Sequence, residues 1–253
     1  MSGPEAANGD IVTAGLVVIG DEILSGRTKD RNIGYIAEHL TNIGIDLREV
    51  RVVPDVEDEI VAALNALRAR YDHVFTTGGI GPTHDDITAD AVARAFGVSI
   101  DLDPRAVAML KSRIPESRLN EARLRMARIP AGASLIENAA SAAPGFSIGN
   151  VHVMAGVPAI MQAMLDALTP KLRKGRRMLA RTVFADMGEG AIAKGLAEVQ
   201  ARFPDVAIGS YPKQVDGRFA TDLVIRARDE ARLAEAASAV EDLVARTAAS
   251  GAS

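Results

Sequence analysis

Buried strands and amphipathic helices alternate along the first 96 residues, and this alternation limits the possible folds more than any other feature of the sequence. Ile11 to Ile19 is a near-continuous apolar run rich in β-branched residues, which is typical of a strand buried on both faces. Further strands are expected at Asp46 to Val53 and at His73 to Phe75, with apolar residues at helical spacing between the three. Such a chain builds a parallel sheet with right-handed crossovers. The sequence therefore predicts an α/β domain.

The third strand leads into a glycine- and aspartate-rich loop, Thr76 to Thr88, which an apolar-periodic helix from Ala89 to Phe96 follows. Three glycines in this loop allow positive φ and let a ligand approach the backbone closely. The helix start adds unpaired N–H donors and a positive dipole end, and both favour phosphate. Asp85 and Asp86 would repel that phosphate unless a divalent cation were bound as well, since Mg²⁺ prefers carboxylate and phosphate oxygens. Alternatively, the two acids only cap the helix, although Thr88 could serve as the N-cap instead.

Acidic residues also follow the first two strands. Asp21 and Glu22 come directly after the first strand, and Asp55 follows the second. Ligands of open α/β sheets bind outside the carboxyl ends of the strands, so the three strand ends are expected to converge on one crevice. An acid pair at a strand end suits a metal site, although Asp21 and Glu22 could simply cap the next turn. Asp55 could likewise be an ordinary turn residue after Pro54.

The middle of the chain is less regular. The segment from Asp103 to Arg128 is expected to be helical, is rich in arginine and is broken by Pro115. It could be a solvated helix pair, a basic wall for substrate phosphates or a subunit contact. Gly149-Asn150 lies between two short apolar runs, which predicts a hairpin that adds an antiparallel edge to the sheet. A helix is expected from Pro158 to Leu168.

The pattern changes after a basic segment, Thr169 to Arg177, which is expected to be a linker. From Met178 onward the expected order of elements is β-α-β-β-α, and this order is typical of a small α+β domain with an antiparallel sheet. Two domains are therefore expected, one at residues 11–170 and a smaller one at residues 178–248.

The composition excludes several classes of function. Apolar residues make up 48% of the 253 residues and charged residues 25%, as in an ordinary globular protein. A net charge of −4 gives no electrostatic footprint for nucleic acid or an anionic membrane. The sequence has no cysteine, so disulfides, thiolate metal sites and cysteine nucleophiles are excluded. Met1 to Asp10 lacks the features of a signal peptide and no apolar run could span a bilayer, so we expect a cytoplasmic protein.

The four histidines have no metal-ligand spacing. His39 and His73 are expected to be structural. His84 differs because it lies inside the glycine–aspartate loop, where it either contacts a ligand or bonds its own backbone.

Two long motifs resemble those of a known family. Thr77 to Thr88 is similar to the T-G-G-x-G-P-T-x-D-D-x-T signature of the molybdopterin-binding-like family, also called the MoaB/Mog domain. Gly20 to Gly26, followed by Asp30-Arg31-Asn32, resembles the G-D-E-[IL]-L-x-G and D-x-N segments of one branch. That branch holds the N-terminal domains of CinA and of eukaryotic FAD synthase. Ser210-Tyr211-Pro212 resembles a motif of the small domain that follows in the same branch.

The resemblance implies a three-layer α/β/α domain with a mostly parallel sheet that assembles as a dimer or trimer. In the CinA-like branch, the domain is similar to metal-dependent pyrophosphatases that act on ADP-ribose or FAD-type dinucleotides. In the molybdenum-cofactor branch, the same fold binds molybdopterin and adenylylates it with ATP and Mg²⁺. Asp55 and Asp86 match two acids that are implicated in catalysis in this second branch.

We therefore expect a metal-dependent hydrolase of a nucleotide diphosphate linkage. The alternatives are a molybdopterin-binding protein without chemistry and a molybdopterin adenylyltransferase. The expected partner is a nucleotide or pterin, with no nucleic acid and no membrane, and the chain is expected to form a homo-oligomer. Asp55 and Asp86 are the expected catalytic residues. The expected ligands of a divalent cation (Mg²⁺, Mn²⁺ or Co²⁺) are Asp21, Glu22, Asp85 and Asp86. The residues expected to bind phosphate or the rest of the substrate are Ser25, Gly26, Asp30, Asn32, Thr77, Gly78, Gly79, Gly81, Pro82, Thr83, His84 and Thr88.

Overall fold

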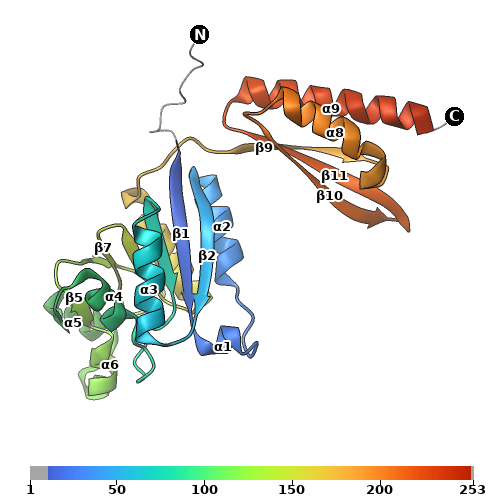
Figure 1. Ribbon diagram of the computed structural model, residues 1–253. Coiled ribbons are helices and arrows are strands. Elements are labelled where there is room, and N and C mark those ends of the chain that lie inside the picture. The colour runs from blue at the N-terminus through green and yellow to red at the C-terminus, as the bar shows by residue number, and fades with distance from the viewer. Residues whose placement is uncertain (1–10, 252–253) are drawn as a thin grey trace, which may run out of the picture. The chain divides into compact units, whose positions relative to one another are not determined.

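The structure is a computed structural model that describes residues 11–251. Met1 to Asp10, for which no signal peptide is expected, lies outside the described residues. The chain divides between Gly175 and Arg176 into two compact units, each with a hydrophobic core of its own (Figure 1). No helix among residues 11–251 is long and apolar enough to cross a membrane.

A six-stranded sheet forms the centre of the first unit. Its strand order is β2-β1-β3-β8-β7-β6. The strands are β1 (Val12–Ile19), β2 (Ile45–Val53), β3 (His73–Thr77), β6 (Ser134–Ile136), β7 (Gly145–Ile148) and β8 (Val151–Met154). Strands β2, β1, β3 and β8 pair in parallel, whereas β7 is antiparallel to β8 and β6 is antiparallel to β7. The expected mostly parallel sheet is confirmed.

Helices cover both faces of this sheet, and alternate side chains of β1 show how the three layers are held together. Val17 and Ile19 pack in one cluster with α3 (Glu57–Arg68), α4 (Thr88–Phe96) and α5 (Pro104–Arg113). Leu16 and Val18 pack in the other cluster with α2 (Asn32–Asn42) and α7 (Pro158–Leu168). Successive residues of a strand point to opposite faces, so a strand that is apolar throughout needs a helix layer on each side. The three-layer α/β/α architecture is therefore confirmed.

The region after α4 is less helical than expected. The break at Pro115 is confirmed, because α5 ends at Arg113 and Ile114 takes an extended conformation, as residues before proline do. A 3₁₀ turn η1 (Glu116–Arg118) and a short α6 (Glu121–Arg125) follow. The sequence did not predict β6 or the antiparallel pair of β4 (Ile100–Leu102) and β5 (Arg128–Pro130). Each of these strands has three residues, which is too short for a period-2 pattern to stand out.

The predicted hairpin at Gly149-Asn150 is confirmed, with Gly149 at a φ of 55° between β7 and β8. Only β7 and β6 form the antiparallel side of the sheet, because β8 pairs in parallel with β3. The short helix α1 (Asp21–Leu24) follows β1 after Gly20, and the 3₁₀ turn η2 (Thr169–Lys171) follows helix α7.

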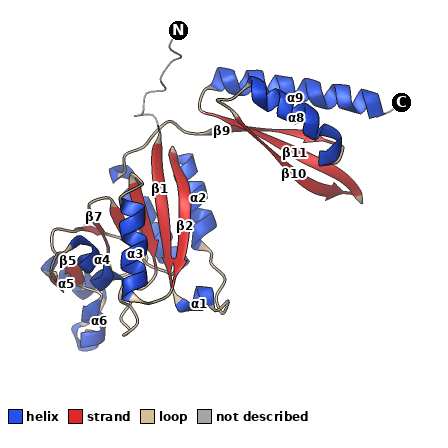
Figure 2. Ribbon diagram, in the orientation of Figure 1, coloured by secondary structure: helices blue, strands red, loops and turns tan. Residues whose placement is uncertain are grey.

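The second unit has the predicted order β-α-β-β-α. Its elements are β9 (Leu179–Ala185), α8 (Glu189–Arg202), β10 (Ala207–Val215), β11 (Arg218–Ala227) and α9 (Glu230–Gly251). The three strands form an antiparallel sheet in the order β10-β11-β9, and α8 and α9 pack on it together (Figure 2). The expected α+β architecture of this unit is confirmed.

Candidate functional site

The carboxyl ends of β1, β2 and β3 bring acidic side chains from three loops together. Asp55 Oδ2, after β2, accepts a hydrogen bond of 2.9 Å from the backbone N–H of Asp21, after β1. Partial burial raises the pKa of the Asp55 carboxyl, this hydrogen bond lowers it, and the nearby charges of Asp21, Glu22 and Asp85 raise it further. Electrostatic repulsion of this kind needs short distances. Four carboxylates from three loops therefore lie near one another: those of Asp21, Glu22, Asp55 and Asp85.

The glycine loop is held by contacts that exclude any side chain at two positions. Gly78 has a φ of 104°, and a Cβ there would lie 2.1 Å from the carbonyl oxygen of Ile19. Gly79 has a φ of 65°, and a Cβ there would lie 2.2 Å from Thr88 Oγ1. These positions require glycine, because only glycine combines positive φ with so little space.

The loop amides differ in what they bind. The Gly78 N–H donates to the Met154 carbonyl of β8 at 3.2 Å, so it is not directed at a ligand, contrary to the expected phosphate contact. The N–H groups of Gly79, Ile80 and Gly81 have no hydrogen-bond partner within the described residues. Successive free amides of a glycine-rich turn make an anion-binding concavity. The free donors that this loop could offer to a phosphate are therefore the N–H groups of residues 79–81.

Asp86 closes the loop upon itself. Its Oδ2 accepts from the backbone N–H of Thr83 at 2.8 Å and from the Thr83 hydroxyl at 2.5 Å. A Cβ at Gly81 would lie 2.6 Å from the same oxygen, so this glycine makes room for the carboxylate. The Thr83 hydroxyl also lowers the pKa of Asp85, helped by the backbone N–H of Asp85 itself. The hydrogen bonds to Asp86 engage one carboxylate oxygen and fix its orientation.

Thr88 does not cap helix α4. It is the first residue of the helix, is fully buried, and its Oγ1 donates to the carbonyl oxygen of Gly78 at 2.9 Å. The N-cap is Ile87, and no side chain makes a capping hydrogen bond at this helix start. The acids of the loop are therefore not helix caps. The buried Thr88 hydroxyl stabilises the loop through its hydrogen bond to Gly78 and is not exposed to a ligand.

A cavity of about 530 Å³ lies against the loop. Of the residues expected to form the site, Glu22, Gly78, Gly79, Gly81, Pro82 and Asp86 line it. Thr28 and the segment Gly156 to Pro158 line it as well, although neither was predicted to belong to the site. Gly156 is the second residue after β8, and a Cβ there would lie 3.3 Å from Gly78 Cα. The strand-end rule that identified Asp21 and Asp55 would have identified Gly156 too, had β8 been placed beside β3.

A second cavity of about 480 Å³ shares Glu22, Thr28, Gly156 and Pro158 with the first. Its lining includes Asn32 and the basic residues Arg27, Lys29 and Arg31. Asn32 is buried, and its Nδ2 donates to the carbonyl of Gly156 at 2.8 Å. This bond fixes the amide orientation, so the partnerless Oδ1 is a buried acceptor that a ligand donor could satisfy.

Other expected binding residues have local roles. Asp30 Oδ1 accepts from the N–H groups of Asn32 and Ile33 at 3.1 and 2.8 Å, so it caps the start of α2, and it also lines the second cavity. Ser25 and Gly26 are exposed and line neither of the two cavities. His84 is also exposed and lines neither cavity, whereas the hydroxyl of Thr77 is buried without a partner.

The carboxylates do not form a complete coordination shell. Within residues 11–251, no group of three or more His, Asp or Glu side chains is arranged to hold a metal ion. Mg²⁺ is often bound by only one or two carboxylates, with substrate phosphates and water as its other ligands. The donor chemistry of this edge suits a cation that binds together with a phosphorylated ligand.

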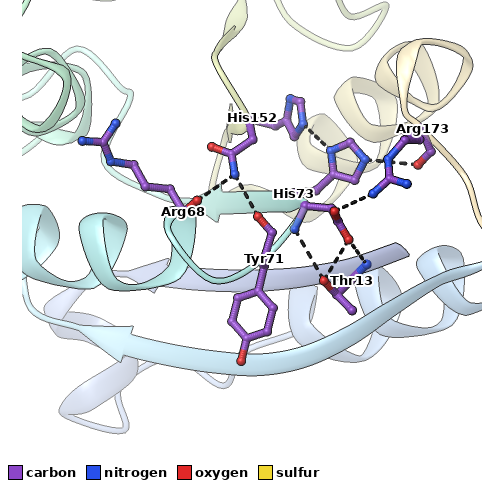
Figure 3. Close-up of polar contacts among 8 residues, drawn as sticks. Thr13, Arg68, Tyr71, His73, His152 and Arg173 are labelled. Carbon is purple, nitrogen blue, oxygen red and sulfur yellow. Dashed lines mark hydrogen bonds and ion pairs between the residues drawn. The ribbon is translucent and has the colours of Figure 1, made fainter. Parts of the chain in front are cut away.

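A different polar cluster lies at the amino ends of β3 and β8 (Figure 3). His73 Nδ1 lies 3.1 Å from His152 Nε2, His73 Nε2 lies 3.1 Å from the carbonyl of Arg173, and His152 Nδ1 lies 2.9 Å from Ser147 Oγ. The carbonyl can only accept, so His73 donates to it, His152 donates to His73, and Ser147 donates to His152. Burial lowers the pKa of both rings, to about 3 for His152. Both histidines are neutral and structural, as expected for His73.

Two families account for almost all of the chain. Residues 15–174 match the family described as a probable molybdopterin binding domain, and residues 177–250 match the family described as FAD synthase, middle domain. The two matches correspond to the two compact units.

Individual relatives support this division. The chain is 37% identical over 236 residues to Protein TK1472 of Thermococcus kodakarensis, which covers 87% of this chain and 92% of that protein. It is 30% identical over 258 residues to the probable FAD synthase of Caenorhabditis briggsae, which covers 92% of this chain but 49% of that protein. The crystal structure of the protein CinA, of unknown function, from Thermoplasma acidophilum is similar with a TM-score of 0.61 and 36% identity. That similarity covers 64% of this chain and 98% of the other.

The first family match spans well over half of the chain, and the second spans nearly all of the smaller unit. The chain therefore belongs to the molybdopterin-binding-domain family, in a branch that joins this domain to a FAD synthase middle domain.

Proposed function

We propose that this protein hydrolyses the diphosphate linkage of a nucleotide of the ADP-ribose or FAD type with the help of a divalent cation. The observation that carries the proposal is the environment of Asp55. Partial burial and three neighbouring carboxylates raise the pKa of this acid, and one of those neighbours, Asp85, belongs to the glycine loop with its free amides. Acids and phosphate donors at one sheet edge are the two components that such a reaction needs.

The glycine loop supplies the phosphate contacts. The N–H groups of Gly79, Ile80 and Gly81 point to no protein acceptor among residues 11–251, and the cavity of about 530 Å³ beside them has room for a nucleotide-sized ligand. Preorganised backbone donors stabilise charge that develops on phosphoryl oxygens without reorganising during the reaction. Phosphoryl transfer depends mainly on such positioning and charge stabilisation, so no covalent nucleophile is needed.

The carboxylates would hold the cation. Asp21, Glu22, Asp85 and Asp86 are the candidate ligands, and phosphate oxygens would complete the coordination because no three acidic or histidine side chains of the described residues do so alone. A divalent cation supplies charge neutralisation at the phosphoryl oxygens and makes water more acidic. Its binding would also relieve the mutual repulsion that raises the pKa of Asp55.

Asp55 is the group that we assign to the attacking water. A raised pKa makes its carboxylate a stronger base at neutral pH than an ordinary aspartate. In the hydrolytic step, the water oxygen forms a bond to phosphorus and its proton passes to Asp55. The bond from phosphorus to the bridging oxygen breaks, and that oxygen leaves with the second phosphate. The products are two phosphate monoesters.

A second function is supported by the family description of residues 15–174 as a molybdopterin binding domain. In that case the same loop would hold a phosphorylated pterin, either without chemistry or as an adenylyltransferase that uses ATP. The glycine amides and the acids serve either ligand, and folds of this kind host several functions. Turnover distinguishes the possibilities.

The test is a substrate panel with a matched pair of variants. ADP-ribose, FAD, NAD and ATP are each incubated with Mg²⁺, Mn²⁺ or Co²⁺, and phosphate monoesters are measured. Asp55→Asn keeps an acceptor for the Asp21 N–H but removes the base, so we expect a loss of about 10²-fold or more in kcat. Asp101→Asn, at an exposed position of β4, is the control.

Each outcome favours one function. No hydrolysis by the wild type, combined with formation of an AMP–pterin adduct from ATP, would favour the adenylyltransferase. Tight pterin binding without any turnover would favour a binding protein. Full hydrolysis by Asp55→Asn would refute the assignment of Asp55.

We also propose that the chain assembles as a dimer or trimer, on the strength of the family likeness. Light scattering coupled to gel filtration measures the mass in solution, and a mass of about 26.6 kDa would show a monomer.

A further inference from the structure

Arg125 lies beside the candidate site, and its positive charge is not paired with any group among residues 11–251. It is the last residue of α6, and its Nε is buried without a hydrogen-bond partner. No hydrogen bond or ion pair joins its guanidinium to another group in residues 11–251. A guanidinium has five N–H donors in a planar fork that matches phosphate oxygens. The donors of Arg125 are therefore available to a ligand.

Three other residues that carry buried, partnerless polar atoms lie in β3 or beside the neighbouring cavity. Within the described residues, the buried side-chain atoms without a hydrogen-bond partner are Thr76 Oγ1, Thr77 Oγ1, Asn32 Oδ1 and Arg125 Nε. The two threonines end β3 directly before the glycine loop, and Asn32 lines the neighbouring cavity. Buried polar atoms are normally paired, so an unpaired one indicates an absent partner such as a ligand or water.

A small cavity joins Arg125 to the loop. Its volume is about 20 Å³, enough for about one water molecule, and Gly79, Ile80, Gly81 and Asp86 line it together with Arg125. The three loop residues and Asp86 also line the larger cavity of about 530 Å³. Arg125 therefore lies beside the residues whose free amides are the candidate phosphate donors.

The other charged residues that line these two cavities, of about 20 and 530 Å³, are either acidic or paired with an acid. Glu22 and Asp86 are the charged residues that line the larger cavity, and both are negative. Arg128 lines the small cavity but forms a two-pronged ion pair with Asp90, with N–O distances of 2.8 and 2.7 Å. Arg125 is thus the cation of these two cavities that keeps its charge for a bound anion.

We propose that Arg125 is an oxyanion-binding residue whose guanidinium donates to a phosphate oxygen of the ligand on the glycine loop. Of the three interpretations that the arginine-rich segment left open, this one assigns Arg125 to the wall for substrate phosphates. The inference rests on the proposed function for the identity of the oxyanion as part of a diphosphate, but it does not require hydrolysis.

The experiment measures binding and stability of the full chain side by side. Isothermal titration calorimetry with inorganic pyrophosphate and with ADP-ribose is performed on the wild type, Arg125→Met, Arg125→Lys and Arg118→Gln. Arg118 is an exposed arginine of the same segment, outside both cavities, so its variant controls for the loss of one charge. Thermal melting of each ligand-free variant is measured in the same buffer.

We expect Arg125→Met to weaken the binding of pyrophosphate by about 10-fold or more, while its Tm is unchanged or higher, because the variant removes a buried unpaired donor. Arg125→Lys should bind with intermediate affinity, since it keeps the charge and loses the fork. Arg118→Gln should change the Kd less than 2-fold.

The inference fails if the wild type binds no pyrophosphate, or if Arg125→Met binds it as the wild type does. It also fails if Arg125→Met and Arg125→Lys both lose several degrees of Tm and retain their affinity, which is the result expected of a purely structural arginine. Hydrolysis is a separate readout. Binding that depends on Arg125 without turnover would overturn the proposed function alone, whereas turnover combined with an unchanged affinity of Arg125→Met would overturn this inference alone.

Discussion

At the amino ends of β3 and β8 the buried polar groups are fully paired, whereas at the carboxyl ends of the same strands several of them are not. His73 and His152 engage all four ring nitrogens in a hydrogen-bonded chain that ends at the carbonyl of Arg173. At the other end, the hydroxyls of Thr76 and Thr77 are buried without partners.

The difference separates two uses of buried polarity. A satisfied network fixes one conformation and needs nothing from outside, while an unsatisfied one is less stable until something binds. The same contrast holds for the charges, since burial keeps the histidines neutral while Asp55 lies in a group of carboxylates that repel one another. This contrast supports the proposal that the carboxyl ends of the strands bind a ligand, while the amino ends contribute to stability.

The largest effect is expected from a side chain in the glycine loop. Gly78→Ala places a Cβ 2.1 Å from the carbonyl oxygen of Ile19 and imposes a φ of 104° on alanine, so it should destabilise the fold by roughly 4 kcal/mol or prevent folding. Urea unfolding followed by circular dichroism measures the effect. Gly97→Ala, at a φ of 65° with nothing within 4 Å, is the control and should lose only about 1 kcal/mol. Equal losses for the two variants would show that backbone strain, and not the contact with Ile19, fixes the loop.

A substitution at the amino ends of β3 and β8 should change the stability of the protein and not its activity. His152→Phe keeps an aromatic ring but leaves the Nδ1 of His73 and the hydroxyl of Ser147 without partners, so we expect a loss of about 2–3 kcal/mol. Hydrolysis per folded molecule should stay within 2-fold of the wild type. A large loss of kcat with little loss of stability would contradict the assignment of the two ends. Chemical denaturation and a rate assay on the same sample make the comparison.

Acid should lower the free energy of unfolding through the protonation of His152. The pKa of His152 falls from 6.5 to about 3 on folding. Between these two pH values, the unfolded chain therefore binds a proton at His152 that the folded chain does not bind. The stability from this histidine is complete above pH 6.5 and is lost as the pH falls from 6.5 toward 3. At about 1.4 kcal/mol per pH unit, the loss between pH 6.5 and 5 is roughly 2 kcal/mol. The free energy of unfolding at the two pH values, measured for the wild type and His152→Phe, tests this. A variant with the full pH dependence of the wild type would place the titrating group elsewhere.

The smallest effect is expected where a charge is removed from the acidic group. Asp55→Asn keeps an oxygen for the Asp21 N–H and removes one repelling charge, so the free energy of unfolding should stay equal or rise by less than about 1 kcal/mol. A gain in stability together with a loss of hydrolysis would show that the charge serves the reaction at the expense of the fold. A clear loss of stability would instead make Asp55 a structural residue. Differential scanning fluorimetry resolves a shift of this size.

The sequence was sufficient for the framework of the fold. Long apolar runs such as Val12–Ile19 and glycine-stopped helices such as Thr88–Phe96 carry periodic signals over eight or more residues, and their elements are found in the structure. The three-residue strands β4 to β6 carry no such signal, because their pairing depends on neighbours far along the chain. Loop chemistry was predictable where it followed a strand end, as with Asp21 and Asp55.

The details of the site depend on long-range contacts that no local pattern contains. The amide of Gly78 looks like a phosphate donor until Met154, more than 70 residues away, is seen to accept from it. Thr88 looks like a helix cap until its hydroxyl is traced to the carbonyl of Gly78. Arg125 lies in a segment with several arginines, and its lack of partners becomes visible only once the hydrogen bonds of Arg113, Arg123 and Arg128 are known.

Gly78 and Gly156 meet almost backbone to backbone, because a Cβ on Gly156 would already lie 3.3 Å from Gly78 Cα. At this junction the floor of the cavity therefore has no side chains that mutation could exchange. A change of substrate during evolution would instead require substitutions of side chains that line the cavities. Arg27 and Lys29 line the cavity of about 480 Å³, and Met126 lines the cavity of about 530 Å³. Relatives that share the glycines are thus expected to share the phosphate chemistry, while differences at these wall positions record differences in what the phosphates are attached to.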